Sequence, residues 1–397
     1  MLNRIIISGL YGHYSYDLPI RFGQRKNICF LTGPNGYGKS TILDMMYAFL
    51  KADARTLLDI PFDMVAFFLK DYKVELLQER SEVISDPNDD YFGSDDEIPD
   101  IRKMTIVVYA ADSGEELERV AFMDQELGEN TNFFPPSLTI YLSSLHVEYL
   151  TDDRLWPRNA DRLGVTSKVM MLKDLMVQYD EQLTALYNIR LIDTIRKHKP
   201  EEVKYEELGK EELVKRAVEK LAAYNKIGLA THLIDDGIAS DEQYLKLMQI
   251  STVDSILTYD DLLFKRLSLL YDIIEKSEFS DKELVLDTEH GLYFKSDDTI
   301  IIPEDLSSGE QHFVIQLITL LIKAEPGALI LIDEPELSYH PAWQMDYLKN
   351  LKRIAEVMKF QFILATHSPQ IFDYHWSYTI DLYKQTTNNA ERIEEGN

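Results

Sequence analysis

Cysteine is almost absent from this sequence, with Cys29 the only one among 397 residues. One thiol cannot form an internal disulfide, and it cannot supply a cysteine-based metal cluster within one chain. Its neighbours Ile28 and Phe30 are apolar. We therefore expect Cys29 to be a buried core thiol.

Long apolar runs are also lacking. No stretch approaches the roughly 18–20 apolar residues that a membrane span needs. The start of the chain, MLNRIIISG, shows no charged leader followed by a long apolar block, so we expect no secretory signal. Both absences favour a cytoplasmic protein with no membrane partner.

Positive charge is scarce, because 41 lysines and arginines face 68 aspartates and glutamates, for a formal charge of −27. Such a surface repels phosphate backbones, so it disfavours broad nucleic-acid binding but still allows a local basic groove. Part of the acidity lies in residues 86–100, DPNDDYFGSDDEIPD. We interpret this aperiodic stretch as a solvated spacer rather than a metal site.

Hydrophobic residues make up 45% of the chain, enough for a sizeable core. Strand-like runs at 4–8, 18–22, 26–32, 65–77, 103–110 and 138–150 surround a helical pattern at 39–51. Residues 156–284 carry amphipathic helical patterns without a sustained heptad repeat. From 285 onward a helix (313–323) alternates with strands at 329–332 and 360–364.

This order predicts an α/β fold around a parallel sheet. Residues 1–155 and 285–397 form the two halves of one domain, and residues 156–284 form a helical insertion, or arm, between them.

The stretch GPNGYGKST, residues 33–41, fits the phosphate-binding pattern G-x-x-x-x-G-K-[ST] between a strand and a helix. Glycines let backbone N–H groups converge on phosphate oxygens, and the helix N-terminus adds its dipole. The lysine would reach the β- and γ-phosphates and the serine would ligate Mg²⁺; the alternative is a glycine-rich turn with a chance lysine. The predicted ATP-binding residues are Asn35, Gly36, Gly38, Lys39, Ser40 and Thr41.

Two later strands also end in polar residues. In ALILIDEPE the apolar run ends at Asp333 and Glu334, at the strand end where α/β sheets place ligands. We predict that Asp333 holds Mg²⁺, directly or through water, and that Glu334 polarises the attacking water. In FILATHSP the strand runs out at His367, which could contact the γ-phosphate or position water. His340 has no such placement, and we interpret it as structural.

These motifs, in this order and together with LSSGEQH at 306–312, resemble the ABC-type head of the AAA-family ATPases shared by SMC, Rad50 and RecF proteins. The resemblance implies ATP and Mg²⁺ as cofactors, with hydrolysis of ATP to ADP and phosphate. It also implies that the signature loop completes the site of a second copy. Ser307 and the backbone of Gly309 would then contact the γ-phosphate bound by the other subunit.

More narrowly, the sequence is similar to ATPases of bacterial anti-phage systems, namely Septu, PARIS and the OLD-type head. Only 30 residues of this sequence follow His367, so we expect no nuclease domain of the OLD type there. Such heads carry a glutamine near the end of the first half, where EYLTDDRLW places Asp153, a possible Mg²⁺ ligand. Tyr11 could stack on adenine, although a packing role is as good an interpretation.

We therefore predict an ATPase that assembles head to head as a dimer or higher assembly. It would act as a sensor or switch for a separate protein effector encoded nearby, in anti-phage defence. The first alternative is a DNA-repair ATPase of RecF or Rad50 type, although the charge does not indicate DNA binding. The second is a transporter nucleotide-binding subunit, which would not normally carry so large a helical insertion.

Overall fold

The computed structural model describes the chain in segments, and they form two compact units. The first unit lies within Met1–Asp152, Glu325–Leu337 and Gln344–Asn397, and the second within Asp153–Ala324 and Ser338–Trp343. The predicted boundaries after residues 155 and 284 stay a prediction. The described residues are 2–20, 22, 27–81, 101–126, 133–151, 167–174, 176–177, 215, 219–220, 222–229, 261–277, 279, 282–297 and 299–385.

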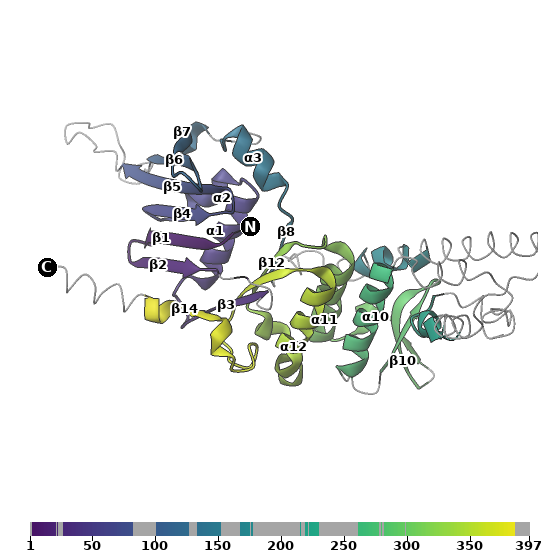
Figure 1. The fold of residues 1–397 in the computed structure, drawn as a ribbon. Coiled ribbons are helices and arrows are strands. Elements are labelled where there is room, and N and C mark those ends of the chain that lie inside the picture. Colours follow the sequence, from purple (N-terminus) through teal and green to yellow (C-terminus); the bar gives the residue numbers. More distant parts are fainter. Residues whose placement is uncertain are drawn as a thin grey trace, which may run out of the picture. The chain divides into compact units, whose positions relative to one another are not determined.

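A five-stranded parallel sheet in the first unit confirms the predicted α/β fold. Its order is β14-β3-β13-β12-β8, and each neighbouring pair is parallel. Strands from before and after the predicted insertion are interleaved within it, so both ends of the chain build one sheet (Figure 1). The strands are β3 (Ile28–Thr32), β8 (Val147–Leu150), β12 (Leu329–Asp333), β13 (Gln361–Ala365) and β14 (Thr379–Asp381).

A six-stranded antiparallel sheet forms the second layer of this unit, in the order β2-β1-β4-β5-β6-β7. Strands β1, β2 and β5 alternate between buried and more exposed residues, as expected for a sheet that packs one face on a core, whereas residues 65–67 of β4 and 104–108 of β6 are buried without a break. They are β1 (Arg4–Leu10), β2 (Tyr14–Pro19), β4 (Met64–Phe68), β5 (Tyr72–Ser81), β6 (Ile101–Ala110) and β7 (Glu116–Met123).

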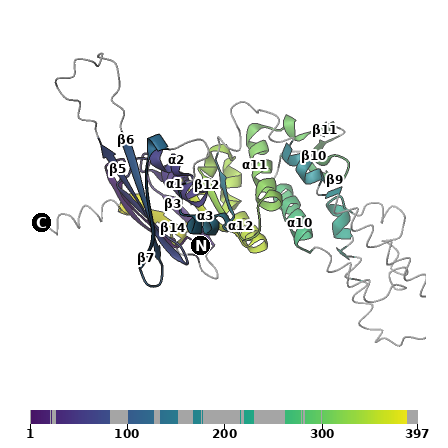
Figure 2. The same cartoon turned by 90° about the horizontal axis from the view of Figure 1, so that it is seen from above.

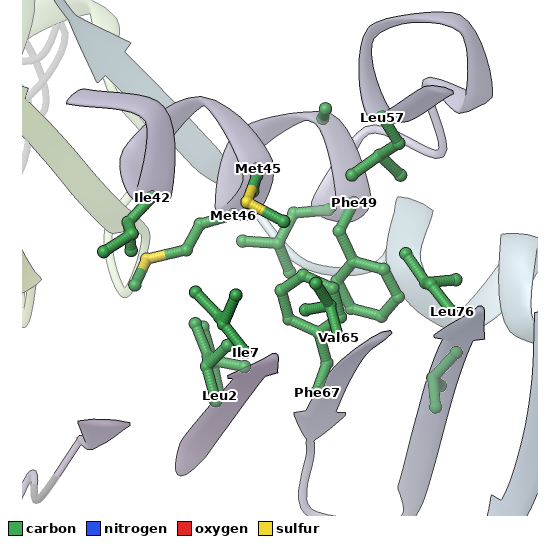
Figure 3. Packing of buried hydrophobic residues seen from close by; sticks show 14 of the residues in the cluster. Leu2, Ile7, Ile42, Met45, Met46, Phe49, Leu57, Val65, Phe67 and Leu76 are labelled. Atoms are coloured by element: carbon green, nitrogen blue, oxygen red, sulfur yellow. The ribbon is translucent and has the colours of Figure 1, made fainter. Parts of the chain in front are cut away.

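The helix α1 (Lys39–Leu50) supplies the core between these sheets. Figure 2 shows α1 and α2 (Ala54–Asp59) beside the antiparallel sheet, and Figure 3 shows side chains of α1 pointing toward β1, β4 and β5. The Phe49 and Phe67 rings stack with centroids 3.9 Å apart. Leu331 and Ile363, from the parallel sheet, belong to the same buried cluster. Burial of this apolar surface therefore fixes the helix that follows the phosphate-binding loop.

The remaining described helices of the first unit are short, apart from α12 (Pro341–Met358), whose first three residues belong to the second unit. They are η1 (Asp124–Glu126), α3 (Pro136–Ser143), η4 (Pro335–Ser338) and η5 (Trp376–Tyr378).

The second unit carries a three-stranded antiparallel sheet, β11-β10-β9, with helices α10 and α11. Phe279 packs against Phe294 and Phe313, with ring centroids 5.1 and 5.8 Å away. These contacts join β10 to α11, which begins at Ser308, within the LSSGEQH stretch, and so starts five residues before the predicted helix 313–323. The elements are α10 (Asp261–Lys276), β9 (Glu283–Asp287), β10 (Gly291–Ser296), β11 (Thr299–Ile301), η2 (Pro303–Asp305), α11 (Ser308–Ile318) and the π-helical η3 (Thr319–Lys323).

Two predicted strands are wrong in detail, and a third, the run 18–22, overlaps only the end of β2 (Tyr14–Pro19). The run 65–77 is a hairpin of β4 and β5, closed by a hydrogen bond from the Leu69 N–H to the Tyr72 carbonyl (2.8 Å). The run 138–150 begins as the helix α3, because Pro136 occupies a first-turn position that favours a helix, and only its end is the strand β8. The fold class is unaffected by these errors.

Most of the predicted arm, residues 156–284, lies outside the described residues. The parts that the structure describes are helical at 167–174, at 222–226 and in α10, as predicted. Among the described helices, none has the length and apolar character that a membrane span requires.

Candidate functional site

The loop between β3 and α1 has the backbone form of an anion cradle. Gly36 and Gly38 have φ values of 85° and 75°, a left-handed backbone conformation that residues other than glycine rarely adopt. Helix α1 begins at Lys39, and no side chain caps its N-terminus within the part of the chain described. Its first-turn N–H groups and its dipole therefore face the loop, as an anion site requires.

The Lys39 side chain is buried and lies across this loop. Its Nζ donates to the carbonyl oxygens of Gly33 (3.1 Å) and Pro34 (3.3 Å) and lies 3.7 Å from Glu334 Oε1. A buried cation at the start of a helix attracts a negatively charged ligand. The lysine thus joins the cradle to the acidic pair at the end of β12.

Ser40 and Asp333 meet across the same edge of the sheet, as the sequence predicts for two Mg²⁺ ligands. The Ser40 hydroxyl donates a hydrogen bond to the Asp333 carboxylate, and Asp44 in α1 lies close enough to interact with it. Burial raises the pKa of Asp333, as does Asp44, against the opposing effects of Ser40 and Lys39.

Asp333 Oδ1 is buried and accepts no hydrogen bond from the residues that the structure describes. A buried carboxylate oxygen without a donor fits a hard cation, which would also relieve the cost of its burial. Ser40 and Asp333 therefore suit Mg²⁺ by donor type and by location.

Glu334 has an unusual backbone for its residue type, with φ at 44°. This left-handed conformation is strained for a glutamate, and it is held by hydrogen bonds from the Glu334 N–H to the Ala365 carbonyl (2.9 Å) and from the Leu337 N–H to the Glu334 carbonyl (3.1 Å). Burial, and then the charge of Glu336, raise the pKa of Glu334 against the opposing charges of His367 and Lys39.

His367 follows β13 and contacts this carboxylate. Its Nδ1 lies 2.6 Å from Glu334 Oε2 and 3.2 Å from Glu336 Oε1. The side chain is 45% exposed, so the ring is open to a ligand. The structure thus brings together the predicted catalytic residues Glu334 and His367.

Glu336 and Thr366 were missed at the sequence level. Glu336 is almost fully buried, and its Oε1 accepts a hydrogen bond from Thr366 Oγ1 (2.7 Å). The only available signal was a second glutamate in DEPE, at the exit of a strand that ends in acidic residues. Nothing local in the sequence links it to a threonine 30 residues later.

The other predicted residues of the cradle occupy its exposed side. Asn35 and Gly36 are exposed, and Thr41 Oγ1 lies 3.1 Å from the Tyr11 hydroxyl. Tyr11 is therefore beside the start of α1, and stacking on adenine stays a prediction. Asp153 lies outside the described residues.

Ser307 and Gly309 belong to the second unit, at the start of α11. Ser307 is the N-cap residue, and its hydroxyl donates to Glu310 Oε2 (2.8 Å), while the Ser307 N–H donates to the same oxygen (2.9 Å). The other oxygen, Glu310 Oε1, pairs with Lys282 Nζ at 2.6 Å. This capping box fixes the N-terminus of an eleven-residue helix that begins at Ser308, within the LSSGEQH stretch.

His340 also belongs to the second unit, directly before α12. Its carbonyl accepts a hydrogen bond from the Trp343 N–H (2.8 Å). This contact agrees with the structural role that we predicted for His340.

Within the first unit, a phosphate cradle, a buried lysine, a serine–aspartate pair and a glutamate–histidine pair share one edge of the parallel sheet. These are the parts that phosphoryl transfer to water requires: positioned anion contacts, metal ligands and a base for the nucleophile. The roles of the individual residues remain predictions.

Comparison with known proteins points to the same kind of fold. A family described as "AAA domain, putative AbiEii toxin, Type IV TA system" matches residues 28–373. No curated protein matches the chain.

Among solved structures, an Smc head domain from Pyrococcus furiosus with an extended coiled coil, bound to the C-terminal domain of ScpA, is similar at 13% identity. The match covers 100% of this chain and 98% of that one, with a TM-score of 0.39. The SMC head domain from Thermotoga maritima is similar at 12% identity over 95% of this chain and 92% of that one, with a TM-score of 0.36.

Proposed function

This chain belongs to the family described as "AAA domain, putative AbiEii toxin, Type IV TA system" and has an ABC-type ATPase head; on that premise we propose that it binds ATP with Mg²⁺ and hydrolyses it. The single observation that carries the proposal is the convergence of Lys39, Ser40, Asp333, Glu334 and His367 at one edge of the parallel sheet.

In this mechanism the cradle and Lys39 bind the β- and γ-phosphates, while Ser40 and Asp333 would hold Mg²⁺, which when bound would neutralise charge on the phosphates. Glu334 accepts a proton from the attacking water, aided by a pKa above that of an ordinary glutamate. His367, held on Glu334 through Nδ1, positions the water or the γ-phosphate.

We further propose that two copies close head to head around ATP. The capping box at Ser307 supports this step, because it presents the N-terminus of α11 behind an exposed serine. Ser307 and the Gly309 backbone would then contact the γ-phosphate held by the other copy. ATP drives closure only to the extent that it binds the closed state better.

The proposed output is control of a separate protein effector, in anti-phage defence. The acidic surface suits a protein partner better than bulk nucleic acid. The family's description as a putative toxin of a type IV TA system also fits a chain that works with a second protein. Localisation in the cytoplasm is part of this proposal.

The test is the solution mass of Glu334→Gln with and without Mg-ATP. We expect the mass to double with nucleotide, because the variant holds ATP without turning it over. Adding Ser307→Arg should prevent the doubling, since a long side chain would block the signature contact. Adding Ser113→Arg, in an exposed turn between β6 and β7, should not. A mass that is indifferent to nucleotide would contradict ATP-driven closure.

A further inference from the structure

Glu336 is a buried carboxylate that the proposed chemistry does not use. It lies in η4, two residues after Glu334, and its side chain is 5% exposed. Taking a carboxylate out of water is costly unless donors satisfy it. Its donors come from the segment directly after β13, which carries His367.

Three donors converge on one oxygen of Glu336. Its Oε1 accepts hydrogen bonds from Thr366 Oγ1 (2.7 Å), the His367 N–H (3.0 Å) and the Ser368 N–H (3.2 Å). Thr366 is fully buried and also accepts a hydrogen bond from the Ser368 N–H through its hydroxyl (3.0 Å). The backbone on both sides of the His367 Cα is therefore tied to one carboxylate.

A second link supports the same anchor. Gln344 in α12 donates from Nε2 to the Glu336 carbonyl (3.2 Å), and its Oε1 accepts from Ser368 Oγ (3.4 Å). Both the main chain of Glu336 and the side chain of Ser368 are thus held by one amide. Hydrogen bonds that share partners in a buried network reinforce each other.

We propose that Glu336 is a positioning residue for ATP hydrolysis: it fixes residues 366–368 and so keeps the His367 ring against the Glu334 carboxylate. The inference rests on the proposed ATPase function. Because the His367 side chain is 45% exposed, packing alone does not hold the ring. Its Nδ1 reaches both carboxylates only while the backbone beneath it is held.

A metal ion is the other arrangement that these side chains could support, because ligand atoms of Glu334, Glu336 and His367 lie within 4.8 Å of one another. The Glu336 oxygen nearest His367 is the one that already accepts three hydrogen bonds from protein donors. The other oxygen, Glu336 Oε2, is buried with no hydrogen-bond partner among the described residues, so a cation would bind there and leave the three hydrogen bonds to Oε1 intact. Those hydrogen bonds therefore anchor residues 366–368 with or without a cation.

The test compares steady-state ATP hydrolysis by full-length wild type, Glu336→Ala, Glu336→Gln and Thr366→Val. In Glu336→Ala, kcat should fall by about tenfold to a hundredfold, since a displacement of about 1 Å can cost that much. The KM for ATP should stay within about threefold. Glu336→Gln keeps an acceptor oxygen and should be faster than the alanine variant. Thr366→Val removes one of the three hydrogen-bond donors to Glu336. Its kcat should lie between those of Glu336→Ala and Glu336→Gln.

Glu356→Ala is the matched control, because this glutamate is exposed on α12; its kcat should equal that of wild type. Hydrogen-exchange mass spectrometry supplies a readout that does not depend on turnover. The peptide containing the His367 and Ser368 amides should exchange faster in Glu336→Ala, while peptides from β1 and β4 should not change.

A wild-type kcat in Glu336→Ala, unchanged exchange in the His367 peptide, or a glutamine variant as slow as the alanine variant would each overturn the proposal. If Glu336→Ala does not fold, Glu336→Gln and Thr366→Val decide it by the same comparison. A wild type without ATPase activity would contradict the proposed function, and the exchange experiment would still decide whether Glu336 anchors the loop.

Discussion

Lys39 is the residue on which nucleotide binding depends most directly. Its buried Nζ already contacts two loop carbonyls and lies near Glu334. Removing a charged donor from a phosphate contact costs about 2–3 kcal/mol, or about a hundredfold in affinity. We therefore expect Lys39→Ala to lose detectable binding of a fluorescent ATP analogue. Lys51→Ala, an exposed lysine at the other end of α1, should bind normally. Equal affinity in wild type and Lys39→Ala would refute the cradle assignment.

Glu334→Gln should separate binding from turnover. Glutamine has the same size as glutamate and tolerates the left-handed backbone at position 334 about as well. It cannot, however, accept the proton of the attacking water. We expect kcat to fall by about a hundredfold or more, as for loss of a general base. Affinity for ATP should stay within a few fold in equilibrium binding. Glu356→Gln is the exposed control, and a wild-type turnover in Glu334→Gln would exclude it as the base.

For single residues, the sequence predicts those whose role can be inferred from the residues next to them. Lys39, Asp333 and His367 each stand at the end of an apolar strand or in a recognisable loop, so each could be named before the structure. Glu336 and Thr366 could not, because their pairing depends on two loops that come together only when β12 and β13 align in parallel. Neither loop has a sequence feature that predicts its contact with the other.

Among the elements, α11 owes its defined start to Glu310. Burial alone would raise the pKa of Glu310, but its hydrogen bonds with Lys282 and with the Ser307 backbone and hydroxyl together lower it below the ordinary value. A carboxyl with a lowered folded-state pKa stabilises the fold above its unfolded-state pKa. That contribution is lost as the pH falls through the folded-state value.

We therefore expect Glu310→Gln to be less stable than wild type at pH 7, by up to about 1 kcal/mol, because glutamine can still cap the helix but leaves Lys282 without its charged partner. Urea unfolding followed by circular dichroism at several pH values would measure the difference. It should shrink as the pH falls through about 4.5, where half of the unfolded carboxyl is protonated. Asp305→Asn, at an exposed neighbouring position, is the control. A difference that grows toward acid would contradict the assigned pairing.

Elements were predicted well where one pattern covers one element. The helix α1 and the strands β3, β12 and β13 agree with their predicted ranges within a few residues. The prediction for the run 138–150 failed because its β-branched and aromatic residues favour a strand, although the first part of the run folds as the helix α3. Pro136 at the first turn, and burial of Leu138 and Leu142 four residues apart, decide for a helix. The proline at the start of this apolar run was the signal that could have predicted the helix.

For the whole molecule, the decisive prediction is that distant segments share one sheet. β3 and β8 precede the predicted arm, and β12, β13 and β14 follow it, yet they interleave in a single parallel sheet. Matching strand-then-polar motifs in both halves predicted this, because such motifs meet at one sheet edge. The arm and its partner could not be predicted in the same way, since amphipathic helices show which face is buried but not what covers it.

Cys29 offers a way to test whether ATP stabilises this sheet as a whole. It is the only cysteine in the chain, it pairs with Ile363 in the middle of the sheet, and burial raises its pKa to about 12. At pH 8 only about one thiol in ten thousand would be ionised, and the thiolate is the reactive form. Labelling by a thiol reagent should therefore require opening of the first unit.

Saturating Mg-ATP should slow this labelling in wild type, because a ligand that binds only the folded state lowers the open population by a factor of about 1 + [L]/Kd. In Lys39→Ala the same nucleotide should have no effect. The labelling rates of wild type and Lys39→Ala, measured by mass spectrometry over time, thus test whether ATP binding at the cradle stabilises the sheet that joins both chain ends. Rapid labelling of the native protein, or equal protection by ATP in both variants, would mean that the cradle and β3 do not stabilise each other.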